Sequence, residues 1–439
     1  MPAKIPRRAS QALLHSLSAG VVPRIGLEHV AVGREDEVTA LRGDLENVAQ
    51  GGAAFRLILG RYGTGKTFLL RLISNYALQT NFVVADADLS PERRLAGSSN
   101  QGLATYRELV RNLATKARPD GGALASLMER WISNVQAKVA RDGVQLDSPN
   151  FQLAVEAKII DVAREMRELV NGFDFAKVII AYWRGYRLDD DSLKESALRW
   201  LRGEYTTKTE ARTALGVRVI IDDNNWYDHL KLLAHFVSQV EYKGLVVMID
   251  EAVNLYQIGN SSSRENNYEK LLTIFNDTMQ GNAEHIGFLL GGTPQFLEDP
   301  RRGLYSYEAL RSRLSETRFA KNGWRDTSSP VLRLQTLTHE EIYVLLQHLA
   351  EVHTAHHQAS YQLFPADYRL FMQEALNRVG SDAFLAPRDL IRDFLSILNI
   401  MQQRPGVSVT QVIHGPDFTP STEDRSTEVE ADEYAEFTL

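Results

Sequence analysis

The chain of 439 residues contains no cysteine. This absence excludes disulfide bonds, thiolate metal ligands and a cysteine nucleophile, and it fits a protein of the reducing cytoplasm. Long apolar runs are also missing, since none approaches the ~20 residues that a membrane-spanning helix needs. The N-terminal segment MPAKIPRRAS is charged but has no apolar stretch behind it long enough for a signal peptide. We therefore expect a cytoplasmic protein with no membrane partner.

Most of the chain carries no net charge, because its acidic and basic residues balance. The formal net charge is -7, and residues 415–439 alone hold eight acidic residues against one arginine. Residues 1–414 are therefore neutral overall, which gives no general indication of nucleic-acid binding. The acidic segment is poor in apolar side chains, so we expect a disordered, solvating tail. The alternatives are a mimic of nucleic acid and a docking segment for a basic partner.

The most specific motif is GRYGTGKT at residues 60–67, which fits the pattern G-x-x-x-x-G-K-[ST]. A short apolar run at residues 55–59 fits a buried strand, and helical spacing of apolar residues resumes from residue 67 to residue 77. Strand, glycine loop and helix form the context that a phosphate-binding loop requires. The alternative is a chance glycine-rich turn, which this context disfavours.

The residue types in this motif suit the binding of ATP with Mg²⁺. Glycines at Gly60, Gly63 and Gly65 let the loop wrap closely, so that backbone N–H groups point at phosphate oxygens. Lys66 can reach the outer phosphates, and the hydroxyl of Thr67 can coordinate Mg²⁺. The residues that we expect to contact the nucleotide here are Gly60, Gly63, Thr64, Gly65, Lys66, Thr67 and Phe68.

A second apolar run, LVVMI at residues 245–249, ends in Asp250 and Glu251. Such a run is typical of a central parallel strand. An aspartate at this position helps to hold Mg²⁺ in P-loop ATPases, and the adjacent glutamate can act as general base towards the attacking water. We assign these roles to Asp250 and Glu251. The alternative is a strand end capped by two solvated acids.

The next predicted strand, residues 286–290, is followed by Gly291 to Pro294. A polar side chain at its tip could hold the attacking water or sense the terminal phosphate. Thr293 is the first candidate, ahead of Asn254 and Gln295. A tight Gly-Gly turn closed by proline is the competing interpretation.

Three arginines are candidates for contacts with the nucleotide. Arg311 and Arg313 follow the Thr293 strand, and either one could act as an arginine finger, in cis or from a neighbouring subunit. Solvated helix arginines are the alternative. Arg388, preferred over Arg392, lies at the proline-led start of a helix and could face the nucleotide. A surface ion pair with Asp389 or Asp393 is the alternative for Arg388.

The coarse pattern predicts an α/β fold, a P-loop NTPase whose parallel sheet is flanked by helices. Residues 82–87 and 331–334 read as further strands. The predicted order of parts is N-terminal helices and the first half of the ATPase core (1–101), a large helical insertion (102–216), the second half of the core (217–335), a helical lid with three helices (336–414) and the acidic tail (415–439).

Two levels of resemblance follow from these residues. The segment Val32-Gly33-Arg34, the phosphate loop, Asp250-Glu251, Thr293, the later arginines and Pro387-Arg388 resemble AAA+-like ATPases of the origin-recognition and signalling type. This resemblance implies that Arg34 lies near the adenine. GGAAFRLILGRYGTGKTF, YWRGYRLDD, ALRWLRGE, GLVVMIDEAVNLY and GLYSYEALRSRL are more specifically similar to the ATP-binding proteins of BREX phage-defence systems, the BrxD type.

The BREX resemblance covers most of residues 20–405. It implies an ATPase of a bacterial or archaeal cytoplasm that acts in defence against phage, with other defence proteins as partners. A motor or switch that remodels DNA or proteins, in a homo-oligomer or a mixed complex, is the first hypothesis. The alternatives are a nucleotide-dependent DNA-binding or loading module and a scaffold that binds ATP without hydrolysis.

Overall fold

Five strands form one sheet in the order β2-β3-β4-β1-β5, and every pair is parallel. The strands are β1 (Ala53–Leu59), β2 (Val83–Asp88), β3 (Leu245–Asp250), β4 (Ile286–Gly292) and β5 (Val331–Arg333). β3 and β4 are buried along their whole length, because the central strands of a parallel sheet are covered on both faces. The predicted α/β class with a parallel sheet is confirmed.

The structure is a computed structural model and describes residues 5–146, 148–167, 169–315, 326–359, 361–379 and 386–414. The chain divides into two compact units. The sheet unit comprises Asp36–Arg61 and Leu72–Leu334, and the helical unit comprises the described residues of Met1–Glu35, Tyr62–Arg71 and Gln335–Leu439. The predicted acidic tail, residues 415–439, lies outside the described residues.

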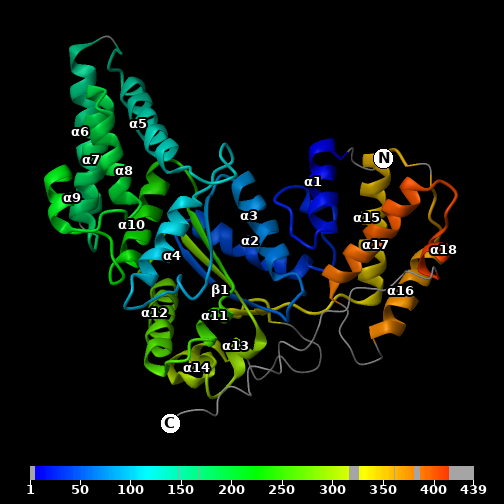
Figure 1. Ribbon diagram of the computed structural model, residues 1–439. Helices are drawn as coiled ribbons and strands as arrows, with labels where there is room; N and C mark the ends of the chain where they lie inside the picture. Colours follow the sequence, from blue (N-terminus) through cyan, green and yellow to red (C-terminus); the bar gives the residue numbers. More distant parts are fainter. Residues whose placement is uncertain are drawn as a thin grey trace. The chain divides into compact units, whose positions relative to one another are not determined.

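Helices flank the sheet on the segment before its first strand and on the segments that connect its strands (Figure 1). They are α2 (Glu35–Ala49), α3 (Lys66–Gln79), α4 (Gln101–Arg111), α10 (Trp226–Gln239), α11 (Val253–Tyr256), α12 (Ser261–Gln280), α13 (Pro294–Glu298) and α14 (Glu308–Leu314), with the 3-10 turn η2 (Leu304–Ser306). α4 packs on β2, α10 on β3 and α12 on β1. The apolar side chains of the predicted strands are therefore buried against these helices.

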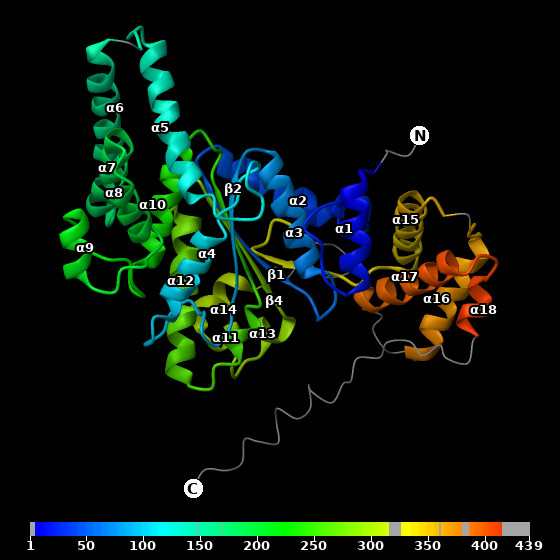
Figure 2. The ribbon, with the colours of Figure 1, turned by 45° about the horizontal axis from the view of Figure 1, so that its top comes forward.

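A bundle of further helices lies between α4 and α10 in the sequence and projects from the sheet (Figures 1 and 2). The bundle consists of α5 (Leu124–Arg141), α6 (Pro149–Arg167), α7 (Gly172–Leu188), α8 (Asp191–Leu201) and α9 (Lys208–Leu215). Phe175 of α7 packs edge-on against Trp200 of α8 and Phe236 of α10, so one continuous apolar core joins the bundle to the sheet. No helix in the described part of the chain is both long and apolar enough to cross a membrane.

The helical unit contains α1 (Arg7–Ser18), the 3-10 turn η1 (Leu27–His29), α15 (His339–His357), α16 (Pro365–Val379), α17 (Pro387–Gln403) and α18 (Val409–Ile413). The three helices predicted after the last strand are present as α15, α16 and α17. α1 packs on α15 and α17 through buried Leu13, Leu14 and Leu17. This long-range packing was not predicted, because periodicity identifies an apolar face without its partner.

His353 is fully buried in the helical unit. Its Nε2 lies 3.1 Å from Oδ1 of Asn399, and its Nδ1 lies 2.6 Å from the hydroxyl of Tyr361. Burial lowers the pKa of His353 to about 4, although the hydrogen bond to Asn399 opposes the shift. The neutral imidazole is therefore the form that the fold accommodates.

Acidification is expected to destabilise the protein through this histidine. Folding lowers the pKa of His353, so the unfolded chain takes up the proton first, and the free energy of unfolding falls as the pH drops from 6.5 towards 4. A shift of this size corresponds to about 3 kcal/mol across that window. Urea unfolding of the wild type and His353→Gln at a series of pH values measures this contribution. Parallel pH profiles for the two proteins would show that His353 does not contribute.

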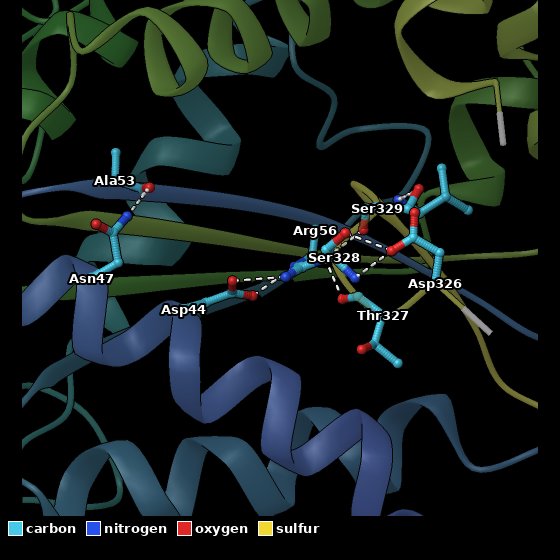
Figure 3. Close-up of polar contacts among 9 residues, drawn as sticks. Asp44, Asn47, Ala53, Arg56, Asp326, Thr327, Ser328 and Ser329 are labelled. Atoms are coloured by element: carbon cyan, nitrogen blue, oxygen red, sulfur yellow. Dashed lines mark hydrogen bonds and ion pairs between the residues drawn. The ribbon is translucent and has the colours of Figure 1, made fainter. Parts of the chain in front are cut away.

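An arginine within the sheet joins α2 to the segment that leads into β5 (Figure 3). Arg56 of β1 forms a bidentate ion pair with Asp44 of α2, with N–O distances of 2.6 and 2.8 Å. Its Nη1 donates to the carbonyl oxygen of Thr327 at 2.9 Å and also to that of Ser329. Arg56 therefore fixes the backbone immediately before β5, which pairs with β1.

Asp44→Ala is expected to lower the free energy of unfolding by about 3 kcal/mol, because the substitution leaves a buried guanidinium without its counter-ion. The Arg56 side chain is only 9% exposed. Glu46→Ala, an exposed acid on the same helix, is the matched control, with an expected change below about 0.5 kcal/mol. Denaturant unfolding distinguishes the two, and equal small losses would contradict a stabilising ion pair.

Candidate functional site

Three central strands end at the same edge of the sheet. Leu59 of β1 pairs with Gly292 of β4, and Ile249 of β3 pairs with Leu290 of β4. The backbone continues this register beyond the strands, because the N–H of Gly60 donates to the carbonyl oxygen of Gly292 at 3.2 Å. The start of the glycine motif thus lies beside the end of β4, which carries the predicted polar residue, and β3 with the two acids is the next strand beyond β4. Ligands of open parallel sheets bind at this carboxyl edge.

Asp250 and Glu251 occupy the end of β3 in different environments. Asp250 is 8% exposed, and its Oδ1 accepts a hydrogen bond of 2.8 Å from the N–H of Glu251. Glu251 is exposed and has a φ of 56°. This left-handed conformation costs a residue other than glycine roughly 1 kcal/mol or more, and such strain gathers at functional sites.

Asn254 stabilises the turn that holds Glu251. Its Nδ2 donates to the carbonyl oxygen of Glu251 at 3.1 Å and to that of Leu89 at 3.0 Å. The N–H of Ala252 also donates to the carbonyl oxygen of Gly291 at 2.9 Å. Asn254, one of the two secondary candidates for water sensing, therefore has its amide group engaged with the backbone.

Thr293 caps the short helix α13, since its hydroxyl accepts a hydrogen bond of 3.3 Å from the N–H of Phe296. Gln295, the other secondary candidate, donates to the Tyr256 hydroxyl at 3.1 Å. That hydroxyl donates in turn to Oδ2 of Asp299 at 2.8 Å. Tyr256 therefore ties the helix after β3 to the helix after β4. Sequence reasoning missed this tyrosine, because no motif marks it.

The remainder of the glycine motif belongs to the helical unit. Gly63 and Gly65 have φ values of 76° and 96°, which residues with a side chain rarely adopt. A Cβ on Gly63 would lie 2.9 Å from the Cβ of Ala386, at the start of α17. α3 begins at Lys66, directly after the loop, as the motif requires. Phe68 packs against the apolar core of this unit.

Arg34 is 6% exposed, and its buried side chain contacts the backbone of the glycine loop. Its Nη2 donates to the carbonyl oxygen of Thr64 at 2.9 Å, and Thr64 is itself buried. Gly33 has a φ of 65°, and a Cβ there would lie 2.5 Å from the carboxyl group of Glu341 in α15. The segment predicted to lie near the adenine therefore contacts both the loop backbone and α15.

Arg388 of α17 also contacts the loop. Its Nη1 donates to the hydroxyl of Tyr62 at 3.0 Å, and its guanidinium carbon lies 4.9 Å from the centre of the Tyr62 ring. Asp389, a predicted alternative partner, forms an ion pair with Arg392 at 3.2 Å. Tyr62 is 54% exposed and was not singled out in the sequence, because this position of the motif accepts any residue.

The two finger candidates differ in their surroundings. Arg313 donates from Nε to Oδ1 of Asn276 at 2.9 Å and from Nη1 to the carbonyl oxygen of Ala309 at 2.8 Å. Arg311 is exposed, and its guanidinium forms no hydrogen bond or ion pair with the described residues. Of the two, Arg311 is therefore the one whose side chain remains available to another molecule.

The oxygen donors of this chain fit Mg²⁺. Thr67, exposed in the first turn of α3, offers a hydroxyl group, and buried Asp250 offers a carboxylate. Mg²⁺ usually keeps several waters and is held by one or two carboxylates together with substrate phosphates. No group of three or more histidine or acidic side chains suited to a metal occurs among the described residues, and a Mg²⁺–nucleotide site does not need one.

In a comparison with protein families, residues 5–417 match the family described as BREX system ATP-binding protein BrxC/D. The match spans the sheet, the helical bundle and the helices after β5. A comparison with curated proteins returns no significant match.

Proposed function

The chain belongs to the BREX system ATP-binding protein BrxC/D family, and from this premise we propose that it hydrolyses ATP with Mg²⁺ at the carboxyl edge of its sheet. The observation that carries the proposal is the convergence of β1, β3 and β4 at that edge, where strained Glu251 follows β3 and the glycine motif follows β1, on either side of β4. A protein that only stores ATP would not require an exposed carboxylate held in a strained backbone there.

In the proposed reaction, backbone N–H groups from Gly60 to Thr67 and the ammonium of Lys66 bind the phosphates. Thr67 and Asp250 would hold Mg²⁺, and the ion would supply positive charge to the phosphate oxygens when bound. Glu251 orients the attacking water and accepts its proton. Thr293 is placed by its capping bond to α13 and serves as the sensor of the terminal phosphate.

Three arginines complete the proposed site. Arg34 maintains the loop conformation through Thr64 and borders the adenine side, as the family resemblance implies. Arg388 responds to the nucleotide from α17, where it already contacts Tyr62 of the loop. Arg311 supplies the finger to a neighbouring copy in a homo-oligomer. The nucleotide state would then drive assembly or remodelling on DNA or on partner proteins of the cytoplasmic defence system.

Lys66→Ala is expected to weaken ATP binding about 30-fold, since it removes charge-assisted hydrogen bonds worth ~2 kcal/mol. A fluorescent ATP analogue titrated into the purified protein measures the affinity. Lys116→Ala, which removes an exposed lysine of the sheet unit, is the matched control and should bind as the wild type does. Equal affinity for both variants would contradict the phosphate loop as the binding site.

A further inference from the structure

Side chains on one face of α5 form hydrogen bonds and an ion pair with the turn between α10 and β3. Arg130, Asn134 and Lys138 are spaced four residues apart, so they lie along one side of the helix. Nη1 of Arg130 donates to the hydroxyl of Tyr242 at 2.9 Å, and its guanidinium carbon lies 4.4 Å from the centre of that ring.

The other two residues of this face bind the two residues before Tyr242. Nδ2 of Asn134 donates to the carbonyl oxygen of Val240 at 3.1 Å, and Lys138 forms an ion pair with Glu241 at 3.6 Å. Glu241 has a left-handed φ of 66°. β3 begins three residues after Tyr242 and ends in Asp250, so α5 is attached to the strand that carries the proposed metal and water residues.

A cavity of about 430 Å³ lies between α5, α6 and α10. This volume falls within the ~300–1,000 Å³ of typical small-molecule sites. Val135 and Val162 give its wall an apolar part, and Asn134 and Lys138, which hold the α10–β3 turn, also line it. A ligand in the cavity would therefore touch the residues that connect the helical bundle to β3.

The polar lining favours an anionic ligand. Trp131 lines the cavity as well, and its indole N–H is buried and has no hydrogen-bond partner among the described residues. Three cations and two acids line the cavity, and one of the acids, Asp161, pairs with Arg164 at 3.5 Å. Lys158 has no ion pair with the described residues, so it can offer its charge to a ligand.

We propose that this cavity binds a small organic anion, with its apolar part against Val135 and Val162 and its anionic oxygen at Lys158. Bound ligand changes the contacts of Asn134 and Lys138 with the α10–β3 turn and so alters nucleotide turnover. Only this second effect rests on the proposed ATPase function, and the binding itself does not.

Anilinonaphthalene sulfonate, an aromatic anion with a short sulfonate end, is the probe. Titrated into the full chain, it is expected to gain fluorescence with saturation at one site. Lys158→Glu should weaken its binding at least about tenfold by reversing a neighbouring charge, and Val162→Trp should abolish binding by filling the cavity. Lys208→Glu, an exposed lysine of the same bundle outside the cavity, should leave the affinity unchanged. Thermal unfolding establishes that each variant is folded.

Two outcomes overturn the binding proposal. One is equal affinity in the wild type, Lys158→Glu and Val162→Trp. The other is loss of the fluorescence in Lys66→Ala together with its retention in Lys158→Glu, which would place the probe at the phosphate loop. Neither outcome depends on whether the protein hydrolyses ATP.

The link to the sheet is tested with Asn134→Ala, which removes the bond to Val240 and keeps the cationic lining. Saturating probe should change wild-type ATP turnover at least about twofold, and the change should be lost in Asn134→Ala while the probe still binds. Bound probe with no effect on wild-type turnover, or with the same effect in both proteins, would refute the link through α5.

Discussion

Arg311→Ala is expected to lower ATP turnover about a thousandfold and to leave ATP affinity nearly unchanged. An arginine that meets the developing charge of phosphoryl transfer contributes ~10³–10⁵ in rate, mostly in the transition state. The side chain is exposed and forms no bond with the described part of its own chain. Phosphate release and the binding of a fluorescent ATP analogue measure the two effects separately.

Arg313→Ala is the matched control from the same helix. Arg313 is bonded to Asn276 and Ala309, so its loss should disturb local packing and lower turnover less than about tenfold. The reverse ranking, with Arg313→Ala the more damaging, would assign the finger to Arg313. Small effects from both would exclude a finger on α14.

Mixing two inactive variants tests whether the finger acts between subunits. Arg311→Ala keeps its own proposed acid and base residues, and Glu251→Gln keeps its arginine. In a mixed oligomer, an Arg311→Ala site would receive the arginine of its Glu251→Gln neighbour and recover turnover. No recovery in a mixture that demonstrably co-assembles would show that Arg311 does not act in trans.

The sheet could be predicted from sequence because each strand is a continuous apolar run that contrasts with its surroundings. LVVMI at residues 245–249 and the run at residues 286–290 became β3 and β4 with small changes at their ends. Burial on both faces leaves little choice of residue there, so the composition itself carries the signal. The same logic predicted α15, α16 and α17 by their helical spacing.

The relations within the candidate site could not be predicted in the same way. Tyr62 and Arg388 meet across 326 positions of sequence, and each alone fits a surface residue. The choice between Arg311 and Arg313 depends on where Asn276 of α12 lies, which is a result of tertiary packing. Local patterns report the chemistry that a residue can perform, whereas its partners depend on how distant elements pack.

The backbone of Glu251 is a further example, and it bears on catalysis. A left-handed glutamate cannot be inferred from the letters Asp-Glu, since the conformation depends on Asn254 and on the bond between Ala252 and Gly291. If this turn aims the carboxylate, Asn254→Ala should lower turnover while ATP remains bound, although it removes no group from the proposed chemistry.

Glu251→Gln is expected to reduce ATP turnover by about 10²–10⁴ because the amide cannot accept the proton of the attacking water. Glutamine keeps the size of the side chain, and the backbone bond from Asn254 to residue 251 does not involve the carboxylate. ATP binding should therefore persist, and the variant should retain ATP where the wild type releases ADP. Glu265→Gln, an exposed glutamate of α12, is the matched control. Equal turnover in the wild type and Glu251→Gln would remove the assigned base. If both proteins instead retain intact ATP, bound nucleotide has a structural role, and hydrolysis is not the activity of this chain.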